Sequence, residues 1–241
     1  MSNIKKHTVV IMQPGYLPWL GFFELMWKSN TFIIYDTVSY DKNGWRNRNR
    51  IKTPAGPQWL TVPVRTSSIA SKLLKDIEID NSSGWNQKHL SALQVNYARA
   101  PWLKEYLPSI TELLRRPWQK LRDLDVALIK LTADLLGLEK NIILSSELKI
   151  KSEDRVGRLI EMVKYLGGTN FYEPAGGRAY LGEKEIAEFE EENISFEFQN
   201  YQHPFYRQLH GEFLPNMAVV DLLLNEGPRS LEILTKGGAP N

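Results

Sequence analysis

The chain has 241 residues, of which 42% are hydrophobic and 24% are charged, values typical of a globular protein with one large domain or two small ones. Its formal net charge of +2 excludes an overall basic surface for binding nucleic acid in bulk, although a tRNA that carries an acyl group stays open as a partner. The absence of cysteine excludes disulfides, thiolate nucleophiles and cysteine-ligated zinc and allows a cytoplasmic location, and no apolar stretch has the length of a membrane span.

The first predicted unit combines a strand, a loop, a helix and a second strand within residues 8–36. Residues 8–12 are a short apolar run, which indicates a strand buried on both faces and ends too early for a signal peptide. The prolines and glycines of residues 13–21 predict a loop, and a helix is expected at residues 22–28. Since no room remains for a hairpin before the strand at 31–36, the two strands should be parallel.

Gln13 and Asp36 follow the ends of these two strands. In an open parallel sheet, ligands bind beyond the carboxyl ends of the strands, so both side chains are expected to face one crevice. An amide and a carboxylate at that place need polar partners, which favours a functional role. Nearby aromatic side chains are expected mainly in the core beneath the loop, although one of them, Tyr16, is also a candidate contact for a substrate.

Residues 45–50 alternate arginine and asparagine after a tryptophan and are expected to form a polar loop. Asn47 and Arg48 supply donors suited to a phosphate or a carboxylate. The alternative is a solvated loop whose charges pair with nearby carboxylates. Trp45 either anchors this loop or stacks on a ligand.

Residues 59–64 predict a strand at an edge, because Pro63 lacks a backbone donor. A small polar loop is expected at 67–71, and residues 75–80 alternate as a half-exposed strand does. From residue 84 the periodicity is helical, and three helices up to about residue 138 form a block that looks like a scaffold or a cap. His89 lies in an apolar stripe there, so it is either a hydrogen-bonded core residue or a secondary catalytic candidate.

Strands and helices alternate again from residue 141, with strands predicted at 141–144, 169–173 and 194–199. Gly176, Gly177 and Arg178 follow one of these strands, where glycine lets backbone amides approach an anion closely. Their pattern matches neither the dinucleotide-binding nor the Walker motif, so a plain turn is an equal alternative.

Residues 201–208 hold the densest group of hydrogen-bonding aromatic and amide side chains. His203 is held extended by the following proline, and its neutral imidazole either takes a proton from an amine or anchors the loop. Tyr206 and Gln208 are candidate contacts for a substrate. Asp221, in a helix predicted at 213–224, either partners another loop or orients His203. Residues 236–241 are expected to form a flexible tail.

These motifs together resemble the WbqC-like family over nearly the whole chain. The resemblance rests on Gln13-Pro14-Gly15-Tyr16-Leu17-Pro18-Trp19-Leu20-Gly21, on residues 45–52 and 59–64, and on His203-Pro204-Phe205-Tyr206-Arg207-Gln208. It implies a bacterial protein encoded among genes for O-antigen of lipopolysaccharide, other surface polysaccharides or small modified metabolites, with a role as a glycine or other aminoacyl transferase. It brings no agreed catalytic residues.

The expected fold is α/β, with a mostly parallel, Rossmann-like sheet flanked by helices and a helical segment at about residues 84–138 to one side. Residues 1–241 are expected to form a single WbqC-like domain. The layout of the first unit resembles that of nucleotidylyltransferase-like enzymes, but residues 17–21 lack the paired histidines of that group, which counts against its ATP chemistry.

The leading hypothesis is an acyl transferase or ligase that forms an amide on an amino sugar or a similar amine. Without a thiol or a serine elbow, the amine would attack an activated acyl donor directly. His203 or Asp36 would remove the amine proton, while Gln13, Asn47 and Arg48 would hold a phosphate or the developing oxyanion.

The competing hypothesis is a non-catalytic protein that binds a sugar nucleotide within a biosynthetic assembly. The histidines have no ligand-type spacing, so no metal is expected, and the sequence identifies no cofactor.

Overall fold

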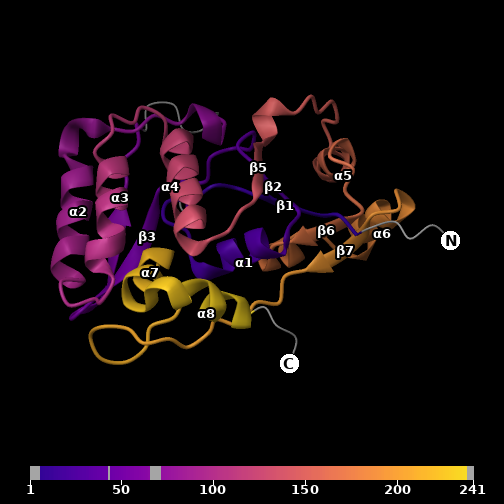
Figure 1. Ribbon diagram of the computed structural model, residues 1–241. Coiled ribbons are helices and arrows are strands. Elements are labelled where there is room, and N and C mark those ends of the chain that lie inside the picture. The colour runs from indigo at the N-terminus through magenta and orange to yellow at the C-terminus, as the bar shows by residue number, and fades with distance from the viewer. Residues whose placement is uncertain (1–5, 43, 66–71, 238–241) are drawn as a thin grey trace.

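The computed structural model describes residues 6–42, 44–65 and 72–237. Its centre is a five-stranded parallel sheet with the strand order β5-β2-β1-β6-β7. The strands are β1 (Thr8–Met12), β2 (Thr31–Ile34), β5 (Asn141–Leu144), β6 (Asn170–Glu173) and β7 (Ser195–Phe198). Helices flank this sheet (Figure 1), which confirms the predicted α/β class and the Rossmann-like arrangement.

The central strand β1 is buried on both faces, as its unbroken apolar run predicts. Val10 belongs to a core formed with α1 (Leu20–Lys28), α4 (Leu121–Leu136), α7 (Val219–Glu226) and α8 (Ser230–Lys236). Val9 and Ile11 point to the opposite face and pack with α5 (Arg155–Tyr165) and α6 (Glu183–Glu191). Each such side chain stabilises the fold by about 1.5–3 kcal/mol when fully buried, so β1 holds the two helical layers together.

The predicted helical segment lies beside the sheet (Figure 1). There α2 (Trp85–Asn96), α3 (Leu103–Leu114) and the first half of α4 share a core with the antiparallel hairpin of β3 (Arg48–Thr53) and β4 (Gly56–Thr61). Leu124 and Leu128 of α4 belong to this core, whereas Ile129 and Ala133 belong to the core against the sheet. The single helix α4 therefore couples the segment to the sheet.

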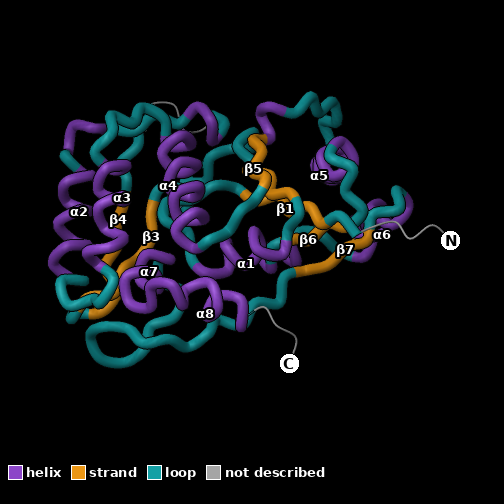
Figure 2. Tube along the Cα trace, in the orientation of Figure 1, coloured by secondary structure: helices purple, strands orange, loops and turns teal. Residues whose placement is uncertain are grey.

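Two predictions of local structure are wrong. The arginine-rich stretch is not a loop throughout, because Arg48–Thr53 is the strand β3, which lies beside β4 (Figure 2). Arg50 pairs with Trp59 across this hairpin. Residues 75–80 form single bridges and a 3-10 helix (Leu74–Asp76) rather than a strand. Ile77 and Ile79 are nevertheless buried, so alternating burial arises there without regular strand pairing.

Other differences concern where elements end. The helix expected from residue 213 begins at Val219, because residues 199–217 cross the surface without regular secondary structure. Lys236, expected in the tail, is the last residue of α8, whereas residues 238–241 and the loop predicted at 67–71 lie outside the described residues. None of the helices within the three described ranges is both long and apolar enough to cross a membrane.

The strand order places a topological switch point at the centre of the sheet. The chain passes from β1 to its neighbour β2, and later returns to β6 on the other side of β1. At such a point the loops that follow the strands diverge and leave a crevice for ligands. Gln13 follows β1 and Pro174 follows β6, so these loops border the candidate site.

Candidate functional site

Two neighbouring cavities open beyond the carboxyl ends of the central strands. The arginine cavity has a volume of about 390 Å³, and its polar lining includes Gln13, Tyr35, Arg46, Arg155, Arg158, Glu173 and Tyr180. The tryptophan cavity has a volume of about 310 Å³, and its lining includes Pro18, Trp19, Phe22, Trp45, Arg50 and Asn216. Met12, Gln13 and Arg46 line both cavities, which therefore meet at the end of β1.

Glu173, the last residue of β6, supplies a carboxylate to the arginine cavity. The residue is 2% exposed, and this burial raises the pKa of its carboxyl to about 7. The hydroxyl of Tyr180 donates to Oε1 at 2.7 Å, and this bond and the charge of Arg155 both oppose the rise. Oε2 accepts no hydrogen bond from any residue that the structure describes. A carboxyl that titrates near neutrality and keeps one oxygen free has the properties of a general base.

Three guanidinium groups converge on the same cavity. Arg46 donates from Nη1 to the carbonyl oxygens of Gln13 (3.2 Å) and Pro14 (3.0 Å), which fixes it between the two cavities. Arg155 lies 3.9 Å from the ring centroid of Tyr180, and the Nε of Arg158 is buried without a hydrogen bond to a described residue. Within the described ranges, none of the three forms an ion pair with a carboxylate. Their positive charge is therefore available to an anion.

The turn after β6 passes directly over Glu173. It forms a short 3-10 helix, Ala175–Ala179, and a Cβ added at Gly177 would lie 2.2 Å from Oε1 of Glu173. Glycine is thus required there for a close approach, whereas a Cβ at Gly176 would meet nothing within 4 Å. Both glycines line the arginine cavity as an anion-binding turn should, but Arg178 instead lies 4.3 Å from the ring centroid of Phe198 and lines neither cavity.

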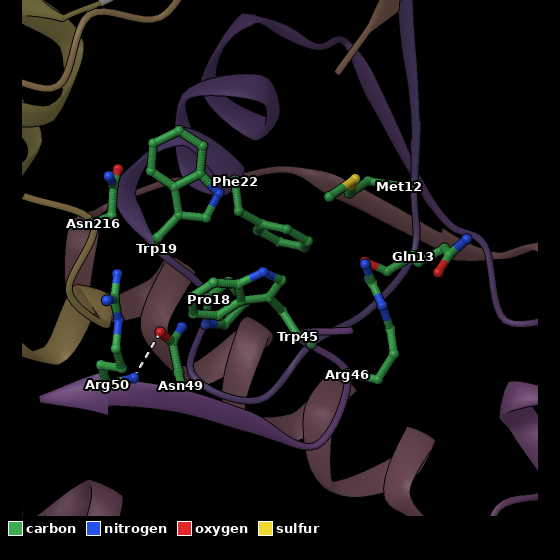
Figure 3. A pocket seen from close by; sticks show the side chains of 11 residues that line it. Met12, Gln13, Pro18, Trp19, Phe22, Trp45, Arg46, Asn49, Arg50 and Asn216 are labelled. Carbon is green, nitrogen blue, oxygen red and sulfur yellow. Dashed lines mark hydrogen bonds between the residues drawn. The ribbon is translucent and has the colours of Figure 1, made fainter. Parts of the chain in front are cut away.

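Gln13 lies where the sequence predicts and borders both cavities. Its side-chain amide makes no hydrogen bond within the described part of the chain, and Figure 3 shows it directed away from Trp19 and Phe22. Tyr35 adds a hydroxyl to the arginine cavity that is buried and, among the described residues, unpartnered. An amide and a hydroxyl thus lie beside the guanidinium groups, and such polar groups are able to orient a ligand.

Trp45, a predicted contact for a ligand, lines the tryptophan cavity. Figure 3 shows its ring close to those of Trp19 and Phe22, with Arg50 and Asn216 on the side away from Gln13. The Trp45 ring also lies 5.1 Å from that of Trp59 and 5.4 Å from the Arg50 guanidinium. This lining is mainly aromatic, in contrast to the charged arginine cavity.

Asp36 lies outside both cavities, which corrects the expectation that it shares a crevice with Gln13. It is fully buried, and its oxygens accept hydrogen bonds from Ser145 Oγ (2.9 Å) and from the amide (2.9 Å) and hydroxyl (2.7 Å) of Ser146. Arg122 on α4 completes the set with an ion pair at 2.6 Å. These donors leave Asp36 no oxygen directed at a substrate, and the residue ties β2 to β5 and α4.

His203 also lines neither cavity. Its ring stacks on Trp19 and Tyr206 at centroid distances of 6.4 and 6.1 Å, and its Nδ1 lies 2.9 Å from the carbonyl oxygen of Pro204. Burial lowers the pKa of His203, so the imidazole is neutral. It therefore anchors residues 199–217 against Trp19, which is the alternative that the sequence left open.

Asp221 partners this loop rather than His203. It accepts hydrogen bonds from the hydroxyls of Tyr97 (2.6 Å) and Tyr206 (2.8 Å) and from the Gln208 amide (2.9 Å). Tyr206 and Gln208, predicted to contact a substrate, thus hold the loop to α7 and α2.

Four further candidates have internal partners. Tyr16 is fully buried with its hydroxyl 2.9 Å from Nδ1 of His89, whose pKa burial lowers to about 4. The Asn47 amide donates to the carbonyl oxygen of Val62 at 2.8 Å, and the Arg48 guanidinium lies 4.9 Å from the Trp59 ring. None of the four lines either cavity.

Asp125 on α4 is a buried carboxylate that the sequence reasoning missed. It is 0% exposed, and neither oxygen has a hydrogen-bond partner among the described residues. Burial raises its pKa well above the ordinary value, opposed by the charge of Arg46. Asp125 thus adds a buried carboxyl group close enough to Arg46 for their charges to interact.

Glu173, Arg155, Arg158 and Tyr180 were missed as well. Glu173 ends a strand with an acid, and this signal had drawn attention to Asp36, but only the strand order shows that β6 adjoins β1. Arg155 and Arg158 lie three residues apart at the start of α5, a spacing that places both on one face of the helix.

A family model described as the WbqC-like protein family matches residues 13–233 of the chain. The chain is also similar to "Uncharacterized protein Rv1507c" of Mycobacterium tuberculosis, with 31% identity over 227 residues that cover 94% of this chain and 96% of that protein. No solved structure matches the chain significantly. Apart from Met12, the matched range includes the residues named above for both cavities, from Gln13 to Asn216.

Proposed function

The chain belongs to the WbqC-like protein family, and from this premise we propose that the arginine cavity is the active site of an acyl transferase or ligase. The reaction forms an amide between a glycyl or other aminoacyl group and an amino sugar or similar amine, within the biosynthesis of a surface polysaccharide or a small metabolite. The observation that carries the proposal is the placement of Glu173, with its raised pKa, in one cavity with three arginines that form no ion pair with any described carboxylate. A cytoplasmic location is part of the proposal.

Glu173 acts as the base in this proposal. The amine lone pair forms the new C–N bond to the acyl carbon, and the bond to the leaving group breaks with its electron pair. The proton released from nitrogen passes to the free oxygen of the Glu173 carboxylate. A carboxyl pKa of about 7 suits this transfer, because about half of the carboxyl groups are ionised at neutral pH and still bind a proton readily.

The arginines act on the acyl donor. Arg155 and Arg158 bind a phosphate or carboxylate of the activated donor, and Arg46 stabilises the oxyanion that develops on the acyl oxygen. The Gln13 amide and the turn at Gly176 and Gly177 supply neutral donors beside them. Glycyl-tRNA, glycyl-CoA and an acyl adenylate made from ATP all carry such an anion, so the site chemistry fits each donor.

A second candidate function is non-catalytic binding of a sugar nucleotide within a biosynthetic assembly. The unpaired arginines favour it, since they bind a phosphate whether or not a bond is formed. The two functions differ in what they require of Glu173. Catalysis needs its carboxylate as a base, whereas for binding alone the negative charge of this carboxylate would only repel an anion.

Amide formation tests the proposal directly. Purified protein is incubated with glycyl-tRNA, glycyl-CoA, or glycine with ATP, each with a panel of amino-sugar nucleotides, and products are detected by mass spectrometry. We expect Glu173→Gln to lower the rate by about 100-fold or more, which is the usual contribution of a general base. Glu197→Gln is the matched control, because Glu197 lies on the neighbouring strand β7 and is exposed.

Two results would count against catalysis. One is the absence of product with every donor and acceptor. The other is a Glu173→Gln variant that restores the biosynthetic pathway in cells as well as wild type, which would favour the binding function.

A further inference from the structure

We propose that the tryptophan cavity binds the nucleobase of a nucleotide whose phosphates lie in the arginine cavity. This inference rests on the proposed function, because it assigns a substrate class to the site that adjoins Glu173. It concerns a different set of side chains, so the two proposals can fail separately.

The walls of the tryptophan cavity are suited to a flat ring. Trp19, Phe22 and Trp45 line it together, and Phe22 is only 2% exposed (Figure 3). Trp45 is 46% exposed even though it packs on Trp59, so one large aromatic surface remains uncovered beside the cavity. Stacking of a base on an aromatic side chain contributes about 1–3 kcal/mol, which makes such walls effective for any nucleobase.

Polar groups stand at the outer end of this cavity. The Nε of Arg50 is buried and has no hydrogen-bond partner in the part of the chain that the structure describes. Asn216 is exposed at the same end, and none of its side-chain atoms bonds to a described residue. A guanidinium and an amide are the side-chain groups that most often read the edge of a base, because each pairs with two neighbouring ring atoms.

The inner end of the tryptophan cavity opens toward the unpaired charge. Arg46 lines both cavities, and Arg155 and Arg158 lie beyond it in the arginine cavity. A ligand that extends through both cavities thus needs a flat apolar ring at one end and negative charge at the other. A nucleotide joins these two parts in one molecule, whereas a free aminoacyl group or an unphosphorylated sugar does not.

The volume agrees with this division. The tryptophan cavity, at about 310 Å³, is at the lower limit of ligand pockets and holds one ring system rather than a whole nucleotide. The arginine cavity provides about 390 Å³ more for phosphates and for the group that reacts near Glu173.

Calorimetric titration with simple probes tests the inference. The probes are ADP, GDP, CDP and UDP, together with pyrophosphate, which lacks a base, and glucosamine 1-phosphate, which carries a hexose in place of the base. We expect at least one nucleoside diphosphate to bind wild-type protein about tenfold or more tightly than pyrophosphate.

Variants locate the source of this preference. Trp45→Ala should abolish it, Trp45→Phe should keep most of it, and Trp27→Ala should leave it unchanged, because Trp27 is similarly exposed but lies at the end of α1. Asn216→Gly is a second variant that does not disturb the hairpin: glycine accepts the φ of 60° at this position, and loss of the amide should reduce the preference about threefold or more.

Three results would overturn the inference: equal binding of pyrophosphate and all four nucleotides, a preference that survives both Trp45→Ala and Asn216→Gly, or equal and Trp45-dependent binding of glucosamine 1-phosphate. The last result would assign the cavity to a hexose. Absence of binding by every probe would overturn the anion site as well. A nucleotide preference in a protein that forms no amide would uphold this inference and contradict the transferase.

Discussion

Asp36 and Glu173 are both buried carboxylates at the carboxyl ends of strands in the same sheet, yet their surroundings differ. Asp36 accepts hydrogen bonds from two serines and an arginine, whereas Glu173 accepts one from Tyr180 and faces a cavity. Burial alone therefore does not distinguish a structural acid from a reactive one. The number of donors that reach the carboxylate does, because donors stabilise its charge and occupy the oxygens that a substrate would need.

Removal of Asp36, the carboxylate with the full set of hydrogen-bond donors, should have the largest effect on stability. We expect Asp36→Ala to lower the free energy of unfolding by about 3–5 kcal/mol, since Arg122, Ser145 and Ser146 would lose their common acceptor. Urea denaturation measures this loss. Asp123→Ala is the control, because Asp123 also pairs with Arg122 but is half exposed, and should cost below about 1 kcal/mol. Equal losses in the two variants would remove the distinction drawn for Asp36.

Glu173, which accepts fewer hydrogen bonds than Asp36, should make the stability of the protein depend on pH. Below about pH 4.5 Glu173 is protonated in the folded and unfolded states alike; as pH rises to about 7 the unfolded chain releases this proton while the folded chain keeps it. The stability of wild type relative to Glu173→Gln should thus fall by about 3 kcal/mol over this range and stay low above it. Parallel stability curves for wild type and Glu173→Gln would contradict the raised pKa.

The two glycines of the turn after β6 offer a steric test. Gly177→Ala should push the Glu173 carboxylate from its position and cost about 1–3 kcal/mol, because the new Cβ would lie 2.2 Å from Oε1. Gly176→Ala meets nothing within 4 Å and should change the free energy of unfolding by less than about 0.5 kcal/mol. Denaturation of both variants decides the point, and similar values would mean that the turn does not constrain Glu173.

The smallest expected effect is on the affinity of the arginine cavity for an anion. Arg155→Ala and Arg158→Ala should each weaken the binding of pyrophosphate about tenfold, since each removes a charged donor worth about 1.4 kcal/mol or more. Arg178→Ala should leave binding unchanged, because that guanidinium lies over Phe198 outside the cavity. Titration calorimetry compares the three, and an equal loss in Arg178→Ala would indicate attraction by general surface charge.

More of the fold than of the candidate site could be predicted from the sequence. Short apolar runs at residues 8–12 and 31–34 define the central strands, because a strand covered on both faces needs apolar residues throughout. The hairpin of β3 and β4 was harder to recognise, since Arg48 and Arg50 give it a polar composition and their packing on Trp59 is a tertiary contact.

The site depends on which strands are neighbours. Gln13 was found because it follows the central strand, and Trp45 because a tryptophan in a polar stretch is unusual. Asp36 and Glu173 look alike in sequence. Nothing in the neighbouring residues shows that Ser145 and Arg122 donate hydrogen bonds to Asp36 and not to Glu173. The charged partners of Glu173 come from α5 and from the 45–46 region, so the pairing of distant elements creates the site.

A direct titration of Glu173 tests the central claim. The carbon-13 chemical shift of its side-chain carboxyl, assigned by comparison with Glu173→Gln, would be followed from about pH 4 to about pH 9. The account predicts a midpoint near pH 7 that rises when pyrophosphate binds, because a bound anion disfavours a second negative charge beside it. A midpoint at the ordinary value near 4.5, unaffected by pyrophosphate, would contradict the assignment of Glu173 as the base.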